Sequence, residues 1–298
     1  MLKNSLIESP TFLFKNNRYY CVDCDLSFKR KKSVPAHKQL HDPQNEFLNN
    51  YIKHSFENIE YVNGIPVVVY VFWFGGYKKK CPLMSWNRYC AFRSIVENIS
   101  VPVILITYCN YKSFIKKNFP INKSFEYLSG VHKSDYFRVY MLNHYGGGYH
   151  DIKWRNDGWK DEWEKDNWTK DENIWMYGIR EKNKNAIGYP PGKRDIQNEY
   201  KKLISMSWII CKKNTPYTNE LLNQIEIILN KNYEKLKKNP GINSSGYYFD
   251  KPFDLVKENS YPLRWLEILG EIFHPLMLKY NNHIKYGLKD AIFNKRYK

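Results

Sequence analysis

The chain lacks several features that would assign it to a large class of proteins. Across 298 residues, no hydrophobic run approaches the roughly 18 apolar residues that a membrane-spanning helix needs. The start of the chain has no apolar core followed by a small-residue cleavage site. There is no internal repeat and no serine, histidine and aspartate motif for acyl chemistry. These absences predict a soluble intracellular protein with no signal peptide and no transmembrane segment.

Cysteine is scarce and mostly irregular in its spacing. Of the six cysteines, only Cys21 and Cys24 stand close together. The other four are Cys81, Cys90, Cys109 and Cys211. Irregular cysteines in a chain without a secretion signal argue against a disulfide framework, so we expect reduced thiols.

Acidic residues are few relative to basic ones. The chain has 30 acidic and 47 basic residues, which gives a net charge of +17. Such a charge suits anionic partners, including nucleotide sugars, nucleic acid and acidic membrane surfaces, without choosing among them. The 43% hydrophobic and 17% aromatic content is enough for one large domain with a small appendage.

The two close cysteines open a motif at residues 17–42 that predicts a small ββα zinc finger. Two thiolates on a hairpin and two imidazoles one helical turn apart would close a tetrahedron around zinc with no open position. Tyr19, Phe28 and Val34 occupy the places where such fingers keep their apolar core. The predicted zinc ligands are Cys21, Cys24, His37 and His41.

Two roles for this finger remain open. By similarity to DNA-reading fingers, its base-facing residues would be Arg30, Ser33 and Ala36, of which only arginine is a strong reader of guanine. Pro35 lies inside the expected helix, and one finger covers only about three base pairs. A folding module or protein-docking element is therefore favoured over weak nucleic-acid contact through the basic residues 29–32.

The rest of the chain predicts an α/β domain over residues 63–298, joined to the finger by a linker at 43–62 that contains a helix between Glu46 and Ile59. The apolar segment 65–73 predicts a buried strand, 84–98 a helix and 101–107 a second strand. This order predicts a parallel βαβ unit.

Further elements and a ligand-binding edge are also predicted. Residues 203–211 indicate another buried strand, and Thr215 followed by Pro216 indicates the start of a helix. Because βαβ units bind ligands beyond the carboxyl ends of their strands, Trp73 at the end of the first strand is a candidate for stacking on a ligand ring.

Charged residues surround a triple-glycine turn in the segment 132–153. Asp135 and Arg138 stand three apart in an expected helix, which places both on roughly one face. The glycines at 146–148 end that helix, and 149–154 predicts a strand with Asp151 and Lys153 on one face. If this strand folds back along the helix, the charged side chains converge.

This segment resembles glycosyltransferases of the capsular-polysaccharide and mannosyl-transfer type, in which Ser-Asp-x-x-Arg precedes Gly-Gly-x-Tyr-x-Asp-x-Asp. The resemblance covers about residues 65–280 and implies a GT-A-like nucleotide-binding domain active in polysaccharide biosynthesis. It implies that Asp135 and Arg138 hold the donor sugar or its phosphates, and that Asp151 carries a divalent ion, Mn or Mg. It also places Trp73, Gly147 and Gly148 at the substrate.

Lys153 stands where the family has its second aspartate. An ammonium group cannot ligate a metal because it has three donors and no acceptor. Lys153 would then neutralise the donor diphosphate in place of part of the metal charge, or another acid such as Asp157 would supply the ligand, or the chain has lost activity. The first alternative is favoured because a cation remains useful beside phosphate. Asp151 and Lys153 are thus the expected catalytic residues.

The sequence therefore predicts a glycosyltransferase that moves a sugar from a nucleotide-sugar donor to a glycan, protein or other acceptor. The alternative is a zinc-finger nucleic-acid-binding or adaptor protein that carries an inactive transferase fold. The net charge and Lys153 favour that alternative, whereas the completeness of the remaining motif opposes it.

Overall fold

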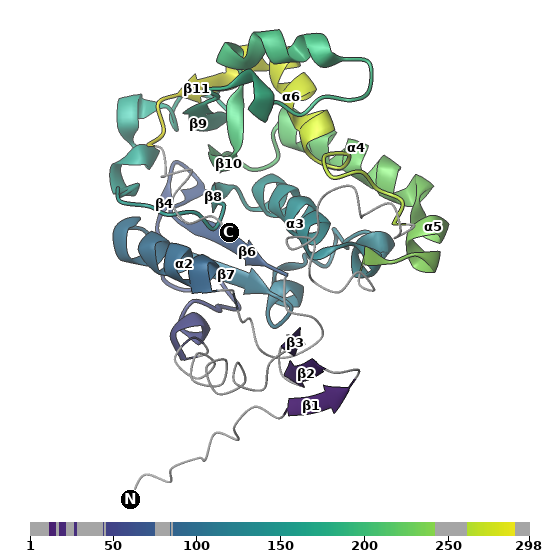
Figure 1. Cartoon of the computed structure of the whole chain (residues 1–298). Helices are drawn as coiled ribbons and strands as arrows, with labels where there is room; N and C mark the ends of the chain where they lie inside the picture. Colours follow the sequence, from purple (N-terminus) through teal and green to yellow (C-terminus); the bar gives the residue numbers. More distant parts are fainter. Residues whose placement is uncertain are drawn as a thin grey trace, which may run out of the picture.

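The structure of the protein is a computed structural model. It describes residues 12–15, 18–21, 27–28, 44, 46–74, 84, 86–241 and 261–289. Figure 1 shows the course of the chain, with a central sheet covered by helices.

A mixed sheet of six strands forms the centre of the molecule, in the order β11-β9-β10-β8-β6-β7. Strand β6 pairs in parallel with both β7 and β8, whereas β10 runs antiparallel to β8 and β9, and β11 is parallel to β9. The predicted α/β class is confirmed. The strands are β6 (Val69–Trp73), β7 (Val103–Thr107), β8 (Gly147–His150), β9 (Met176–Arg180), β10 (Ile204–Cys211) and β11 (Ile284–Tyr286).

The predicted βαβ unit is present as β6, α2 (Trp86–Asn98) and β7. All five residues of β7 are buried, although β7 is the edge strand of the sheet. The first strand begins later than predicted, because residues 65–66 form the short strand β5 (Ile65–Pro66). It pairs with β4 (Tyr61–Val62) across an Asn-Gly turn with positive φ at both residues.

The helix predicted between Glu46 and Ile59 is much shorter in the structure. The chain is helical at 46–49 and then turns. The carbonyl oxygen of Tyr51 accepts a hydrogen bond from the amide of Leu105 in β7. Leu48 is fully buried in the core, and Phe47 and Tyr51 pack edge-on against Phe92 of α2. The first half of the predicted linker therefore packs against the α/β domain.

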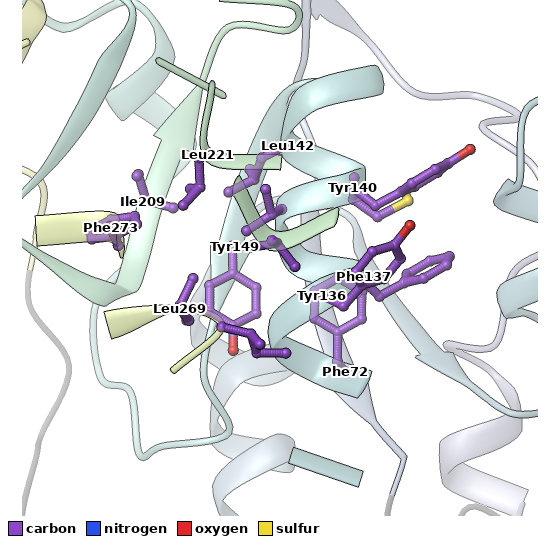
Figure 2. Close-up of a cluster of buried hydrophobic side chains, with 14 of the residues drawn as sticks. Phe72, Tyr136, Phe137, Tyr140, Leu142, Tyr149, Ile209, Leu221, Leu269 and Phe273 are labelled. Carbon is purple, nitrogen blue, oxygen red and sulfur yellow. The ribbon is translucent and has the colours of Figure 1, made fainter. Parts of the chain in front are cut away.

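Helices cover both faces of the sheet. On one face, α3 (Gly130–His144), α4 (Pro216–Lys231) and α6 (Gly270–Lys279) enclose an aromatic-rich core, part of which is drawn in Figure 2. On the other face, α2 packs with three buried tryptophans, Trp159, Trp163 and Trp168. A short helix, α5 (Tyr233–Lys238), follows α4. The 3₁₀ helices are η1 (Tyr111–Phe114), η2 (Lys123–Tyr127), η3 (Lys160–Trp163), η4 (Lys165–Asn167), η5 (Lys184–Ala186), η6 (Arg194–Lys202) and η9 (Asn281–His283).

The predicted strand at 203–211 and the predicted helix start at Thr215 are both confirmed. Strand β10 begins at Ile204, and α4 begins at Pro216. Thr215 caps α4, because its hydroxyl accepts a hydrogen bond from the Thr218 amide while Thr218 bonds back to the Thr215 amide.

The predicted helix with Asp135 and Arg138 is α3, which Ser129 caps through a hydrogen bond from the His132 amide. The strand predicted at 149–154 instead starts at Gly147 and ends at His150. The shift has a steric cause. A Cβ on Gly148 would lie 3.0 Å from Val69 Cγ2 and 3.2 Å from the Val68 carbonyl oxygen, so the glycines lie inside the strand and let β8 approach β6.

In the N-terminal region, a three-stranded antiparallel sheet is formed by β1 (Phe12–Lys15), β2 (Arg18–Cys21) and β3 (Ser27–Phe28). Of the predicted zinc ligands, Cys21 ends β2, and Cys24, His37 and His41 lie outside the described residues. Zinc binding and the division at 17–42, 43–62 and 63–298 stay predictions. In the described ranges, no helix combines the length and apolar character needed to cross a membrane.

Replacing Gly148 with alanine should destabilise the protein by about 1–3 kcal/mol, because the new methyl group overpacks the β6–β8 contact. Urea unfolding followed by circular dichroism would measure the loss. Gly64→Ala is the matched control: nothing lies within 4 Å of its added Cβ. It should cost only the roughly 1 kcal/mol of a positive φ. A Gly148→Ala protein as stable as wild type would contradict the close approach.

Candidate functional site

Four charged side chains from the two sides of the glycine turn meet in one cluster. Asp135 and Arg138 of α3 form an ion pair of 3.0 Å. Arg138 Nη2 also lies 3.6 Å from Oδ1 of Asp151, which follows β8 directly. Lys153 Nζ lies 2.9 Å from the other oxygen, Oδ2, of Asp151. The predicted convergence of these residues is confirmed.

This charge cluster, Asp135, Arg138, Asp151 and Lys153, is largely buried. Residue exposures are 7% for Asp135, 8% for Arg138 and 5% for Lys153. The side chain of Asp151 is 23% exposed and is the member that reaches solvent most. Buried charges of this kind persist only when they are paired and hydrogen-bonded, which is the case for all four.

Strand β10 holds both cations in place. Arg138 Nη1 donates to the Met206 carbonyl oxygen at 2.8 Å, and Lys153 Nζ donates to Ser207 Oγ at 2.9 Å. The Asp151 amide donates to the Ser207 carbonyl oxygen at 2.8 Å. These groups do not follow from the sequence, because the pattern of a buried strand does not say which neighbouring strand it pairs with.

Tyr149 also contacts the charge cluster, and its role there was not predicted from the sequence. Its ring lies under the Arg138 guanidinium, 4.1 Å from ring centre to Cζ, and its hydroxyl donates to Asp151 Oδ1. The ring stacks on Phe72 of β6, beside Phe137 of α3 (Figure 2). Its place in the Gly-Gly-x-Tyr pattern could have identified it, since Arg commonly packs over aromatic faces.

The electrostatics of the two carboxylates differ. Burial raises the pKa of Asp151, but Lys153 and Arg138 outweigh burial, and the net pKa lies below its usual range. For Asp135, burial dominates: it raises the pKa to about 6, with Arg138 opposing and Asp151 adding to the rise. Around neutral pH the cluster therefore holds two carboxylates and two cations. Burial likewise raises the pKa of Tyr149, so its hydroxyl stays protonated.

Three other predicted site residues lie apart from the cluster. Trp73 is partly buried and packs with the core on the α2 face of the sheet, whereas its neighbour Phe72 faces Tyr149. Gly147 and Gly148 are buried against β6, where a Cβ on Gly147 would lie 3.3 Å from Pro66 and Tyr70. These contacts give both glycines a packing role, and their contact with substrate stays a prediction.

The cluster does not fit an ordinary two-carboxylate ion site. Each oxygen of the Asp151 carboxylate already faces a cation, and the position of the second aspartate is an ammonium group. Asp157, the substitute ligand considered from the sequence, is exposed, and its backbone oxygen accepts from Arg155 Nε at 2.7 Å. In the part of the chain that the structure describes, no three His, Cys, Asp or Glu side chains gather to hold a metal ion.

The chain is similar to one protein family and to solved structures. A family model described as "Capsular polysaccharide synthesis protein" matches residues 22–268. The solved structure "PaToxG Glycosyltransferase" aligns with 88% of this chain and 99% of its own chain, at 16% sequence identity and a TM-score of 0.34. No curated protein matches the chain.

The raised pKa of Asp135 predicts a pH dependence of stability. Because this pKa is about 6 in the folded protein and about 4 in an unfolded chain, the unfolded chain loses the proton first as pH rises. Asp135 therefore lowers the free energy of unfolding as pH rises from about 4 to about 6, by up to roughly 3 kcal/mol.

Asp135→Asn should remove this decline. Urea unfolding at about pH 4 and about pH 7 would measure it, with the difference between the two pH values as the readout. The exposed Asp157→Asn is the control and should keep the decline of the wild type. An Asp135→Asn protein with an unchanged difference would show that Asp135 titrates normally.

Proposed function

The chain belongs to the capsular polysaccharide synthesis protein family, and we propose that it is a glycosyltransferase that uses a nucleotide-sugar donor. The observation that carries this proposal is the convergence of Asp135, Arg138, Asp151 and Lys153 at the carboxyl ends of β6 and β8. Ligands of α/β sheets bind at that edge. A cluster with two cations there suits the diphosphate of an activated sugar.

In the proposed mechanism, Arg138 and Lys153 bind the diphosphate. Both are positioned before the donor arrives: Arg138 by Asp135, Met206 and the Tyr149 ring, and Lys153 by Asp151 and Ser207. In the transfer step the acceptor hydroxyl oxygen bonds to the anomeric carbon and gives its proton to water. The bond between the anomeric carbon and the phosphate oxygen breaks, and its electron pair leaves with the nucleoside diphosphate. Preorganised cations stabilise that developing charge without reorganising, which is commonly the largest contribution to rate.

The carboxylates have a separate proposed role. Asp151 stays ionised because of its low pKa, and its partly exposed side chain is the one that can accept hydrogen bonds from donor-sugar hydroxyls. Asp135 lies deeper and fixes the Arg138 guanidinium. A divalent ion has no part in the proposed mechanism, because Lys153 occupies the place of the ion's second carboxylate ligand and supplies a fixed positive charge there.

Lys153→Met tests the diphosphate contact. Nucleoside diphosphates and nucleotide sugars at about 100 times their dissociation constant should stabilise the wild type by about 2.7 kcal/mol. That is a rise of roughly 5–10 °C in melting temperature. Lys153→Met should lose most of this rise because the phosphate loses one of its two cations.

Lys160→Met, which removes an exposed lysine, is the control and should keep the full thermal shift. Absence of any shift in the wild type, with or without manganese, would count against the proposed transferase and favour the alternative of an inactive fold.

Lys153→Asp tests whether the ammonium replaces an ion. This change restores the family's second carboxylate beside Asp151, so manganese should now strengthen nucleotide binding about tenfold or more. In the wild type, manganese should change the affinity little. Isothermal titration of a nucleoside diphosphate with and without manganese measures both. Equal manganese dependence in the two proteins would show that Lys153 does not act in place of the ion.

A further inference from the structure

A group of exposed lysines lies where η2 meets the ends of α4 and α5. We call this group the basic surface, and it consists of Lys123, Lys231, Lys235, Lys237 and Lys238. The elements that carry it are in direct contact, because η2 packs against α5, and Asn122 next to η2 donates to Asn230 of α4 at 3.1 Å. The three elements that carry these exposed lysines are thus packed together.

The five lysines of the basic surface outnumber the two exposed acids on the same elements, Glu126 of η2 and Glu234 of α5. In the described ranges, none of its five lysines forms an ion pair. Glu226 at its border is already engaged by Tyr136, whose hydroxyl donates to Glu226 Oε1 at 2.6 Å. A surface with this charge attracts an extended anion more strongly than a small one, because several lysines act together.

Two tyrosines give the basic surface a fixed aromatic component. Lys123 Nζ lies over the Tyr233 ring at 4.0 Å, and the rings of Tyr127 and Tyr233 pack edge to face at 6.0 Å. Both tyrosines are partly exposed. Rings of this kind present an apolar face beside a polar hydroxyl, and such a combination suits the mixed C–H and O–H faces of sugar rings.

The basic surface adjoins the helix that carries the charge cluster. Helix α4 runs back along α3: Thr218, at its start, bonds to Asn143 near the end of α3, and Glu226, toward its end, bonds to Tyr136. Gly241, three residues after α5, lies against Ser129, the cap of α3. From Ser129 to Asp135 the helix rises about 9 Å. The chain just after α5 therefore lies against the beginning of the helix that carries Asp135 and Arg138.

We propose that the basic surface docks the acceptor of the transfer reaction, and that this acceptor is an acidic polysaccharide. The inference rests on the proposed function, which supplies the reaction, while the charge and the aromatic rings supply the chemistry of the acceptor. Carboxylate groups along the glycan pair with the lysines, and its growing end reaches the charge cluster on α3. The surface therefore determines which glycan is extended and holds it between successive additions.

The test compares two triple variants with the same loss of charge. Lys235→Ala, Lys237→Ala and Lys238→Ala together remove three charges from the basic surface. Lys53→Ala, Lys160→Ala and Lys170→Ala remove three exposed charges elsewhere and serve as the control. Affinity electrophoresis in gels that contain polygalacturonate measures binding of an acidic polysaccharide, and gels with dextran measure binding of a neutral one.

The surface variant should bind polygalacturonate about tenfold more weakly than wild type, with a weaker dependence on salt, and the control should change by less than about twofold. Dextran should bind none of the three proteins measurably. Equal loss in the two variants, or unchanged binding in the surface variant, would overturn the proposal.

Two further measurements separate the possible failures. Because Ile227, one turn before Lys231, is an exposed apolar side chain (58% exposed), binding of the wild type and the surface variant to vesicles of anionic lipid is also measured. Binding to double-stranded DNA is measured in the same way. Tighter, surface-dependent binding to either than to polygalacturonate would identify a different partner and overturn the proposal.

The thermal shift with a nucleoside diphosphate should be unchanged in both variants. If that shift is absent in the wild type while polysaccharide binding still depends on the surface, the docking surface stands and the transferase assignment fails.

Discussion

The carboxylate of Asp151, held between the two cations Arg138 and Lys153, is the interaction on which the rest of the site depends. One cation comes from α3 and the other from the segment after β8, so this carboxylate joins the helix to the sheet at its carboxyl edge. Removing a partner from a buried charge group leaves an uncompensated charge that costs several kcal/mol, about 3–5 in typical cases. The turn between helix and strand, the pairing of β8 and the position of β10 are all constrained by the need to keep these charges together.

The same constraint explains the backbone around the glycine turn. Gly147 and Gly148 let β8 lie directly against β6, and β10 then pairs along the other edge of β8. As a result, the Met206 carbonyl oxygen accepts a hydrogen bond from Arg138, and the Ser207 hydroxyl accepts one from Lys153. In the proposed function, a donor diphosphate would compete with the two carboxylates for cations that these contacts already orient.

The sequence predicted local features well where one short segment contained the whole signal. The helix at Asp135 and Arg138, the strand, helix and strand at 65–107 and the cap at Thr215 followed from periodicity and end signals. Predictions failed where a distant contact ended an element. The helix after Glu46 stops early because the chain turns and the Tyr51 carbonyl oxygen accepts a hydrogen bond from Leu105 of β7. The strand after the glycine turn starts early because glycines, which lack a Cβ, can pack directly against β6.

By itself the sequence determined which chemical groups stand on each side of the glycine turn, and that a lysine replaces the expected second acid. Those facts follow from residue identity and spacing along a helix or strand. Only the tertiary structure decided that Lys153 bonds to Asp151, that Tyr149 lies under Arg138, and that Ser207 supports Lys153. It also brought lysines from η2, α4 and α5 onto one surface beside α3. The physical reason is that strand pairing and helix packing decide which elements meet, as for Lys153 and Ser207, which are 54 positions apart. The local hydrophobic pattern says which face of an element is buried without saying against which partner.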